Sequence, residues 1–194
     1  MAKSPKNANS ILKDLRNLFI WVILALIIRW QVIEPRWIPS GSMLPTLHID
    51  DKILVEKLSF KLNLREDISD LRDKIIIFNA PDTLIDEGYN SSTALIKRVI
   101  GVPRDKIEIK EGQLYVNNII QTKYLTDKNI NYSIGPLIVP EESLWVMGDN
   151  RNNSMDSHIW GYLPYEKVIG QAILRYWPLN DFGPIRFPNL ENNG

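Results

Sequence analysis

The segment around Ser42 has the composition of a sharp turn that could present a serine hydroxyl for chemistry. Gly41 lets the backbone turn, and Pro39 and Pro45 restrict it on either side. A serine held clear of strand hydrogen bonds in this way is a candidate nucleophile for acyl transfer. An ordinary surface loop has the same composition, so the hypothesis requires a base elsewhere in the chain.

A lysine inside an apolar strand is the first candidate for that base. Lys97 and Arg98 interrupt an apolar run over residues 94–100. Because side chains alternate across a strand, the two cations point to opposite faces, and at least one points toward packed surface. Burial lowers the pKa of a lysine and leaves a neutral amine, which can take a proton from a serine. The alternative is an edge-strand lysine whose amine reaches solvent.

Histidine offers a second kind of base. The chain has two histidines, His48 and His158, and a serine-histidine-aspartate arrangement would use one of them. Sequence spacing excludes neither. A Ser-x-x-Lys pattern at Ser10 to Lys13 lies ahead of the apolar segment described below, and we attribute it to chance.

A third polar segment runs from Gly148 to Gly161. Segments this rich in amides, carboxylates and hydroxyls commonly form self-bonded turns. A calcium loop is not expected, because Arg151 stands where an oxygen ligand is required and Ser154 where glycine is required. The chain has no cysteine, which removes thiol nucleophiles, disulfides and cysteine-ligated metals. We expect neither a metal nor a cofactor.

An apolar segment precedes the Ser42 turn and predicts a membrane anchor. Residues 17–28 carry no charge, but a bilayer span needs roughly 20 residues. A transmembrane helix over 17–34 therefore requires Arg29 to snorkel and the helix to continue up to Pro35. Residues 1–16 carry four basic side chains and one acidic, which predicts a cytoplasmic leader and places the rest on the opposite face. A cleaved secretory signal and a buried core helix are the alternatives.

The remainder reads as a mainly β domain over residues 35–188. Short β-branched or aromatic runs bounded by turn formers predict strands at 52–56, 74–78, 94–100, 106–110, 113–116, 143–147 and 170–176. Glu111-Gly112 predicts a hairpin turn inside a small hairpin-rich subdomain at about 102–147. Residues 189–194 read as a tail. Acidic and basic residues are equal at 23 each, so the composition does not indicate a nucleic-acid partner.

The three polar segments, in this order after an apolar leader, resemble bacterial type I signal peptidases. These are membrane-anchored serine-lysine endopeptidases with an antiparallel β-sheet catalytic domain, and they remove signal peptides from exported proteins. The motifs that carry the resemblance lie at 40–47, 97–103 and 148–157. The resemblance implies Ser42 as nucleophile, Lys97 as general base and Ser154 as the hydroxyl that orients Lys97. It also implies an oxyanion hole made by the Ser42 backbone N–H and the Ser40 hydroxyl.

The same resemblance implies supporting residues, partners and a location. Asp149, Asp156 and His158 would hold the reacting groups in position without touching the substrate. Shallow pockets for small side chains before the scissile bond would be lined by Ile38, Pro39, Met43, Leu47, Leu95 and Ile96. The partners would be preproteins with small residues before the cleavage site, and membrane lipid. The chain would be a single-pass protein of the plasma or thylakoid membrane, with its catalytic domain on the periplasmic or lumenal face.

Three positions depart from the family pattern. Arg72 and Arg104 stand in turns where the family has glycine, and a left-handed backbone there would cost about 1 to 2 kcal/mol per residue. The last motif ends in His158 where the family commonly has arginine, so the ion pair with Asp156 weakens when the histidine is neutral. The histidine form is typical of cyanobacterial and plant thylakoid members.

Two other hypotheses stay open. A self-cleaving repressor-type protease uses similar serine-lysine chemistry, but the apolar leader and the lack of an evident DNA-binding helical domain weigh against it. A membrane-tethered β-domain that binds peptides without cleaving them is the other. The presence of every motif side chain weighs against that hypothesis.

Overall fold

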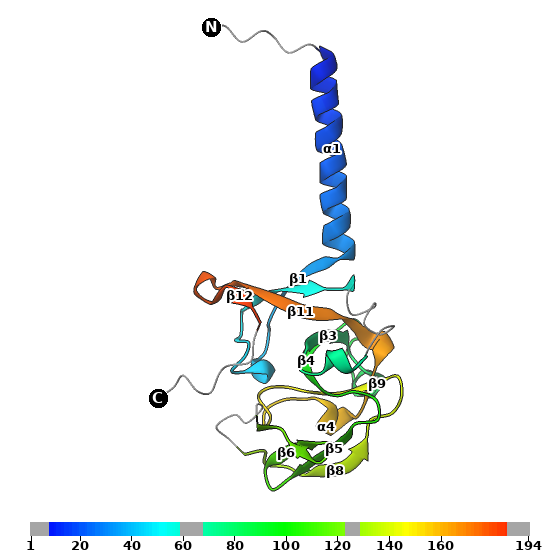
Figure 1. Cartoon of the computed structure of the whole chain (residues 1–194), viewed down its shortest axis with the longest axis vertical. Helices are drawn as coiled ribbons and strands as arrows, with labels where there is room; N and C mark the ends of the chain where they lie inside the picture. The colour runs from blue at the N-terminus through cyan, green and yellow to red at the C-terminus, as the bar shows by residue number, and fades with distance from the viewer. Residues whose placement is uncertain (1–7, 59–67, 123–128, 186–194) are drawn as a thin grey trace.

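A long helix and a body of antiparallel strands make up the computed structural model of this chain (Figure 1), which describes residues 8–58, 68–122 and 129–185. The helix α1 (Ala8–Gln31) stands away from the strands. Its apolar side chains between residues 11 and 28 are exposed, so the alternative of a buried core helix is wrong. Within the described ranges no helix combines the length and hydropathy needed to cross a membrane, and the span predicted over 17–34 is not confirmed.

The two ends of α1 differ from those predicted. The helix begins at Ala8, inside the segment 1–16 predicted as a leader, whose first seven residues lie outside the described part. It ends at Gln31, and β1 (Ile33–Trp37) follows at once and contains Pro35. β1 pairs with a single neighbour at the edge of the sheet, where a proline without an N–H is tolerated.

Eight antiparallel strands form the main sheet. Its order is β1-β2-β11-β3-β4-β9-β10, with β12 paired to β11. The bounds are β2 (Lys52–Glu56), β3 (Ile75–Asn79), β4 (Ala94–Gly101), β9 (Ser143–Met147), β10 (Leu163–Pro164), β11 (Val168–Trp177) and β12 (Gly183–Pro184). The mainly β, antiparallel fold predicted from the sequence is confirmed.

Four further strands form a second, smaller sheet, which we call the small subdomain. Its order is β7-β6-β5-β8, with β5 (Lys106–Lys110), β6 (Gln113–Val116), β7 (Ile119–Ile120) and β8 (Ile134–Ile138). The predicted turn at Glu111-Gly112 is confirmed, since both residues have positive φ and their neighbours Lys110 and Gln113 are paired. β9 belongs to the main sheet, although it lies in the segment 102–147 predicted as one subdomain.

Short helical turns connect the strands. They are η1 (Gly41–Met43), η2 (Ile68–Leu71), α3 (Asp82–Asp86), α4 (Ser157–Trp160), η4 (Tyr165–Lys167) and η5 (Leu179–Asp181). The tail predicted at 189–194 lies outside the described residues.

Apolar side chains cover both faces of the main sheet. On β3, Ile76 and Phe78 pack in one buried cluster, and Ile75 and Ile77 pack in another. β3 is therefore a continuous apolar run instead of an alternating one, as expected for a strand covered on both sides. β4 lies beside β3, so its side chains are also buried on both faces.

Each of the two turns in which this chain lacks the family's glycine contains a residue with a left-handed backbone. Arg104 has φ of 70°, so the strain considered for this position from the sequence is present. In the other turn the left-handed residue is Asp73, also at 70°, and not Arg72. Arg72 instead binds Asp105 through two nitrogen atoms, at 2.9 and 2.5 Å.

Candidate active site

Ser42 is held in a one-turn helix between two prolines. The N–H of Leu44 donates to the Gly41 carbonyl at 3.2 Å and closes the turn η1. The Met43 side chain is fully buried in the core, which anchors the turn, and Ser42 is 9% exposed. A serine fixed by its buried neighbour keeps one orientation, as a nucleophile requires.

Lys97 reaches Ser42 from the middle of the main sheet. β4 pairs with β3 on one side, with Lys97 opposite Ile76, and with β9 on the other. The Lys97 Nζ lies 2.9 Å from the Ser42 Oγ and 3.0 Å from the Ile96 carbonyl oxygen, to which it donates. In the neutral amine, the lone pair can accept the Ser42 hydroxyl hydrogen over that same 2.9 Å. A proton can therefore pass directly between these two atoms.

The surroundings of Lys97 favour the neutral amine. Lys97 is 3% exposed, and burial lowers the pKa of its amine from 10.5 to about 8, although the carboxylates of Asp156 and Asp149 act in the opposite direction. Burial is the largest cause because removing an ammonium from water costs more than two nearby carboxylates return. A useful fraction of the amine is therefore unprotonated near neutral pH.

Ser40 lies next to the Ser42 hydroxyl. Its hydroxyl oxygen is 3.4 Å from the Ser42 Oγ, and Ser40 itself is exposed. A hydroxyl in this place can donate to an oxygen that develops negative charge beside Ser42.

Asn150 fixes the position of the Ser42 turn. Its backbone N–H donates to the Ser42 carbonyl at 3.0 Å, and its side-chain Nδ2 donates to the Gly41 carbonyl at 3.1 Å. Sequence reasoning did not assign Asn150 a role, although it lies within the quoted motif at 148–157. Two hydrogen bonds from one residue tie the third polar segment to the first.

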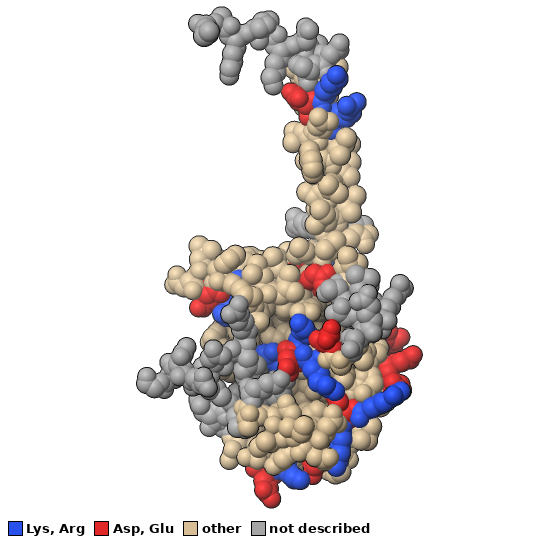
Figure 2. Space-filling view, viewed as in Figure 1, with Lys and Arg blue, Asp and Glu red and all other residues tan. Residues whose placement is uncertain are grey.

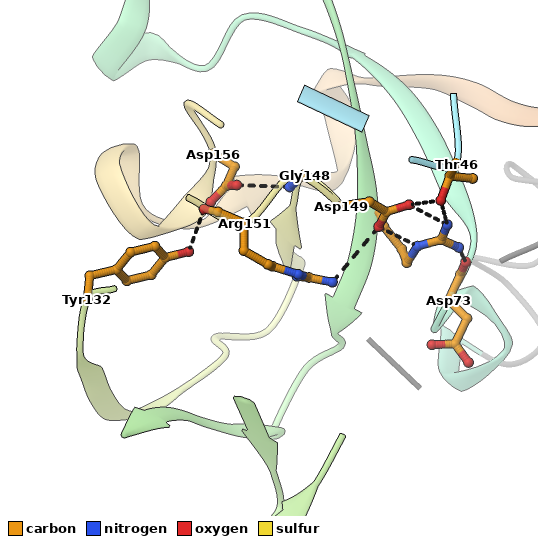
Figure 3. A network of polar contacts seen from close by, with 8 residues as sticks. Thr46, Asp73, Tyr132, Gly148, Asp149, Arg151 and Asp156 are labelled. Atoms are coloured by element: carbon orange, nitrogen blue, oxygen red, sulfur yellow. Dashed lines mark hydrogen bonds and ion pairs between the residues drawn. The ribbon is translucent and has the colours of Figure 1, made fainter. Parts of the chain in front are cut away.

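Asp149 is the centre of a buried ion-pair network (Figure 3). Its carboxylate accepts two hydrogen bonds from the Arg98 guanidinium, at 2.8 and 2.7 Å, and one from the Thr46 hydroxyl at 2.5 Å. Arg98 also donates to the Asp73 carbonyl at 2.6 Å, and Arg151 lies 3.9 Å from Asp149. This network joins the segment after η1 to β4 and to the end of β9, so it holds the elements that carry Ser42 and Lys97 together.

Asp156 organises the other half of the third polar segment. It accepts a hydrogen bond from the Gly148 N–H at 2.8 Å (Figure 3). It also accepts one from the His158 N–H at 3.2 Å, where it caps α4. The His158 Nδ1 lies 2.8 Å from the same carboxylate, and the His158 ring stacks on Tyr132. Tyr132 was missed from the sequence because it belongs to no motif and lies in the small subdomain.

Ser154 is buried beside the nucleophile but is not bonded to Lys97. Its Oγ has no hydrogen-bond partner among the described residues, and Lys97 donates to the Ile96 carbonyl instead. A Cβ on Gly148 would lie 2.2 Å from the Ser154 Oγ and 2.5 Å from the Ser42 carbonyl. Glycine is therefore required at this position, and Ser154 stands close to the nucleophile's own peptide group.

The histidines do not take the place of the lysine. His48 is exposed in the loop between η1 and β2, where its N–H donates to Asp51. His158 is turned toward Asp156. Among the hydrogen bonds of the described residues, none joins either imidazole to Ser42, so Lys97 is the base that the structure brings to the serine.

A shallow hollow of about 190 Å³ lies between β1 and β4. Four of the residues predicted to bind substrate line it, namely Ile38, Pro39, Leu95 and Ile96, together with Arg36, Trp37, Ile53, Ile77 and Ala94. Met43 and Leu47, the other two, are fully buried in the core and do not line the hollow.

Comparison with known proteins identifies the family. The sequence model of the family described as "Signal peptidase, peptidase S26" matches residues 11–177. This chain belongs to that signal peptidase family. As a signal peptidase it is a hydrolase that removes signal peptides, and the resemblance seen in its motifs is confirmed.

Relatives of this signal peptidase include proteins from cyanobacteria and plants. A signal peptidase I of Leptolyngbya laminosa is 38% identical over 96% of this chain and 90% of that protein. A probable signal peptidase I of Synechocystis is 43% identical over 84% of this chain and 71% of that protein. A probable thylakoidal processing peptidase of Arabidopsis thaliana is 39% identical over 89% of this chain and 46% of that longer protein.

Proposed function

We propose that this signal peptidase cleaves preproteins with a Ser42–Lys97 dyad through an acyl-enzyme. The observation that carries the proposal is the 2.9 Å contact between the Lys97 Nζ and the Ser42 Oγ. The neutral amine takes the hydroxyl proton as Oγ attacks the carbonyl carbon of the scissile bond. The Ser40 hydroxyl and the Ser42 backbone N–H donate to the oxyanion that forms.

The same amine then completes the cycle. Collapse of the tetrahedral intermediate breaks the peptide bond, and the Lys97 ammonium gives its proton to the departing amine of the mature chain. The regenerated neutral Lys97 takes a proton from a water molecule, which attacks the ester carbonyl. That second intermediate releases the signal peptide as a carboxylic acid and returns the proton to the Ser42 oxygen.

Two variants with matched controls test this mechanism. Incubation of purified chain with a labelled preprotein should give a discrete mature product for the wild type, and Ser42→Ala and Lys97→Ala should lower turnover by at least about 1,000-fold. Ser92→Ala and Lys74→Ala change an exposed serine and an exposed lysine, and should cleave like the wild type. Cleavage by folded Lys97→Ala at the wild-type rate would remove the lysine from the mechanism.

We further propose that the hollow beside β4 selects small side chains before the scissile bond. Most of its lining residues are aliphatic, and the hollow is shallow and open, so it can cover a small apolar side chain more completely than a large one. A preprotein with alanine before the cleavage site should therefore be processed, and leucine at the same place should lower kcat/KM by about 10-fold or more. Equal rates for alanine and leucine would contradict this assignment.

We also infer that α1 attaches the peptidase to a lipid bilayer, with the catalytic domain on the periplasmic or lumenal face. Side chains such as Leu18, Phe19 and Trp21 are at least 60% exposed, and on the face shown in Figure 2 the charged residues of the helix gather near its N-terminal end. A long exposed apolar surface is costly in water. Trp37 and Trp177 are also exposed, and tryptophan favours the membrane interface.

Vesicle flotation tests the membrane assignment. Leu24→Lys combined with Ile27→Lys should lower the fraction of chain that floats with liposomes, because each places a charge on the apolar surface of α1. Asp86→Lys combined with Glu87→Lys adds charge on the exposed end of α3 and should leave flotation unchanged. Equal flotation of the two double variants would contradict the assignment.

A further inference from the structure

The small subdomain is bonded to the loop that carries the third motif, residues 148–158, which we call the active-site loop. The Asn131 N–H donates to the Asn152 side-chain oxygen at 2.9 Å, and the Asn152 amide donates back to the Asn129 carbonyl at 2.9 Å. The Tyr132 hydroxyl donates to the Arg151 carbonyl at 3.3 Å. Three hydrogen bonds thus join one short segment of the subdomain to two adjacent residues of the active-site loop.

The same tyrosine makes a ring contact deeper in the loop. The rings of Tyr132 and His158 are stacked, with centroids 4.1 Å apart and planes 10° apart. A flat contact of this kind restricts rotation of the imidazole about its bond to the side chain. The His158 Nδ1 therefore stays directed at the Asp156 carboxylate, 2.8 Å away. Burial raises the pKa of Tyr132, so its hydroxyl keeps its proton and remains a donor.

Asp156 links this contact to the general base. The charged and titratable groups that act on one another here are Lys97 and Arg98 from β4, Asp149, Arg151, Asp156 and His158 from the active-site loop, and Tyr132 from the small subdomain. The negative charge of Asp156 raises the pKa of Lys97 against the effect of burial. A hydrogen bond from the imidazole N–H to the Asp156 carboxylate reduces the effect of this negative charge on Lys97. The pKa of the Lys97 amine is therefore lower than it would be without that hydrogen bond.

We propose that Tyr132 is a positioning residue of the peptidase: by stacking on His158 it maintains the His158–Asp156 hydrogen bond and so sets the charge that Lys97 experiences. This inference rests on the proposed role of Lys97 as general base. The small subdomain then has a role in the reaction, because it holds the active-site loop in the conformation that Ser42 and Lys97 require.

The pH dependence of kcat/KM on a preprotein-derived peptide tests the proposal. Tyr132→Leu should move the ascending limb to higher pH by about half a unit, which is roughly a threefold loss at pH 7 that disappears above the limb. Tyr132→Phe keeps the ring and should restore the limb to the wild-type position. Tyr115→Leu, a tyrosine change on β6 of the same subdomain, should not move it.

A second variant covers the case in which Tyr132→Leu does not fold. His158→Gln removes the other ring of the stack and should move the limb in the same direction. An unchanged limb in His158→Gln would overturn the proposal without any Tyr132 variant. Where Tyr132→Leu folds, the double variant should shift the limb no further than the larger single shift, because the two rings act as one unit. Additive shifts would overturn the coupling between Tyr132 and His158.

Two further outcomes distinguish a failure of the role of Tyr132 from a failure of the Ser42–Lys97 mechanism. An equal loss for Tyr132→Leu at every pH, or no loss at all, would overturn the positioning role while leaving the dyad intact. Wild-type activity in Lys97→Ala would instead remove the general base itself, and the role of Tyr132 with it.

Discussion

The side-chain nitrogen of Lys97 lies 2.9 Å from the hydroxyl oxygen of Ser42, within the distance of a direct proton transfer. The serine comes from a one-turn helix between two prolines and the lysine from the centre of an eight-stranded sheet. Burial lowers the pKa of the lysine to about 8, so in the proposed mechanism the contact joins the nucleophile to a base that is partly neutral at neutral pH.

Activity should rise with pH through the ionisation of Lys97. The reaction requires the neutral amine, and the pKa of that amine is lowered from 10.5 to about 8. Below that pH, kcat/KM should therefore fall by about tenfold per unit, and above it the rate should level off. A steady-state pH profile of the wild type measures this limb. A limb centred near 10.5 would show that the lysine is not perturbed.

Gly148→Ala should lower turnover strongly and lower the stability of the fold only moderately. The new methyl group would lie 2.2 Å from the Ser154 Oγ and 2.5 Å from the Ser42 carbonyl, so both must move. Overpacking of this kind costs about 1 to 3 kcal/mol, and a displacement of about 1 Å at a nucleophile can cost about 100-fold in rate. Turnover and urea denaturation measure the two effects.

Gly88→Ala is the control for the Gly148 change. Unlike Gly148, Gly88 has a left-handed backbone, at φ of 99°, and a Cβ there has no heavy atom within 4 Å. It should cost some stability through backbone strain and leave the rate unchanged. If Gly148→Ala and Gly88→Ala had the same turnover, close packing of Ser154 and Ser42 against Gly148 would not matter to the reaction.

Asp149→Asn should lower the free energy of unfolding by about 3 to 5 kcal/mol, because it leaves the buried Arg98 guanidinium without its counter-charge. The matched change is Glu141→Gln, which breaks the Arg104–Glu141 ion pair at 2.7 Å on the surface. Those two side chains are 85% and 64% exposed, and the change should cost less than about 1 kcal/mol. Equal costs in chemical denaturation would contradict the central place of Asp149.

Arg104→Gly should leave the protein as stable as before or more stable, by up to about 1 kcal/mol. Glycine relieves the strain of φ at 70°, and this gain exceeds the extra freedom that it gives the unfolded chain. Arg104→Ala removes the same surface ion pair but keeps the strained backbone, so it should be less stable than the glycine variant. An alanine variant at least as stable as the glycine variant would show that the turn is not strained.

The sequence singled out the two side chains that the structure brings into contact, Ser42 and Lys97, but not the residues that hold them in place. Ser42 stood out because a glycine and two prolines surround it, and Lys97 because it is a cation in an apolar strand; both are local signals. The Arg98–Asp149 pair and the stack of Tyr132 on His158 join residues that are distant in sequence, and they depend on how β4, β9 and the small subdomain pack. No local pattern carries that information.

The accuracy of the predicted strands also differed from one strand to another. The strands β2, β5, β6 and β9 matched their predictions because compact apolar runs end at turn formers. β1 was missed because it contains Pro35, and β8 because it contains Pro136, and both prolines argue against a strand from sequence alone. The same bias extended the predicted helix past Gln31, because proline was taken as the signal that ends it.

A direct titration of the Lys97 amine tests the central claim. NMR of the full chain with lysines labelled with ¹³C at Cε, assigned with a Lys97→Arg variant, follows the protonation of this one side chain. We predict a midpoint at about pH 8, far below the 10.5 of an ordinary lysine. A midpoint near 10.5 would mean that the amine stays charged at neutral pH and cannot take the proton from Ser42.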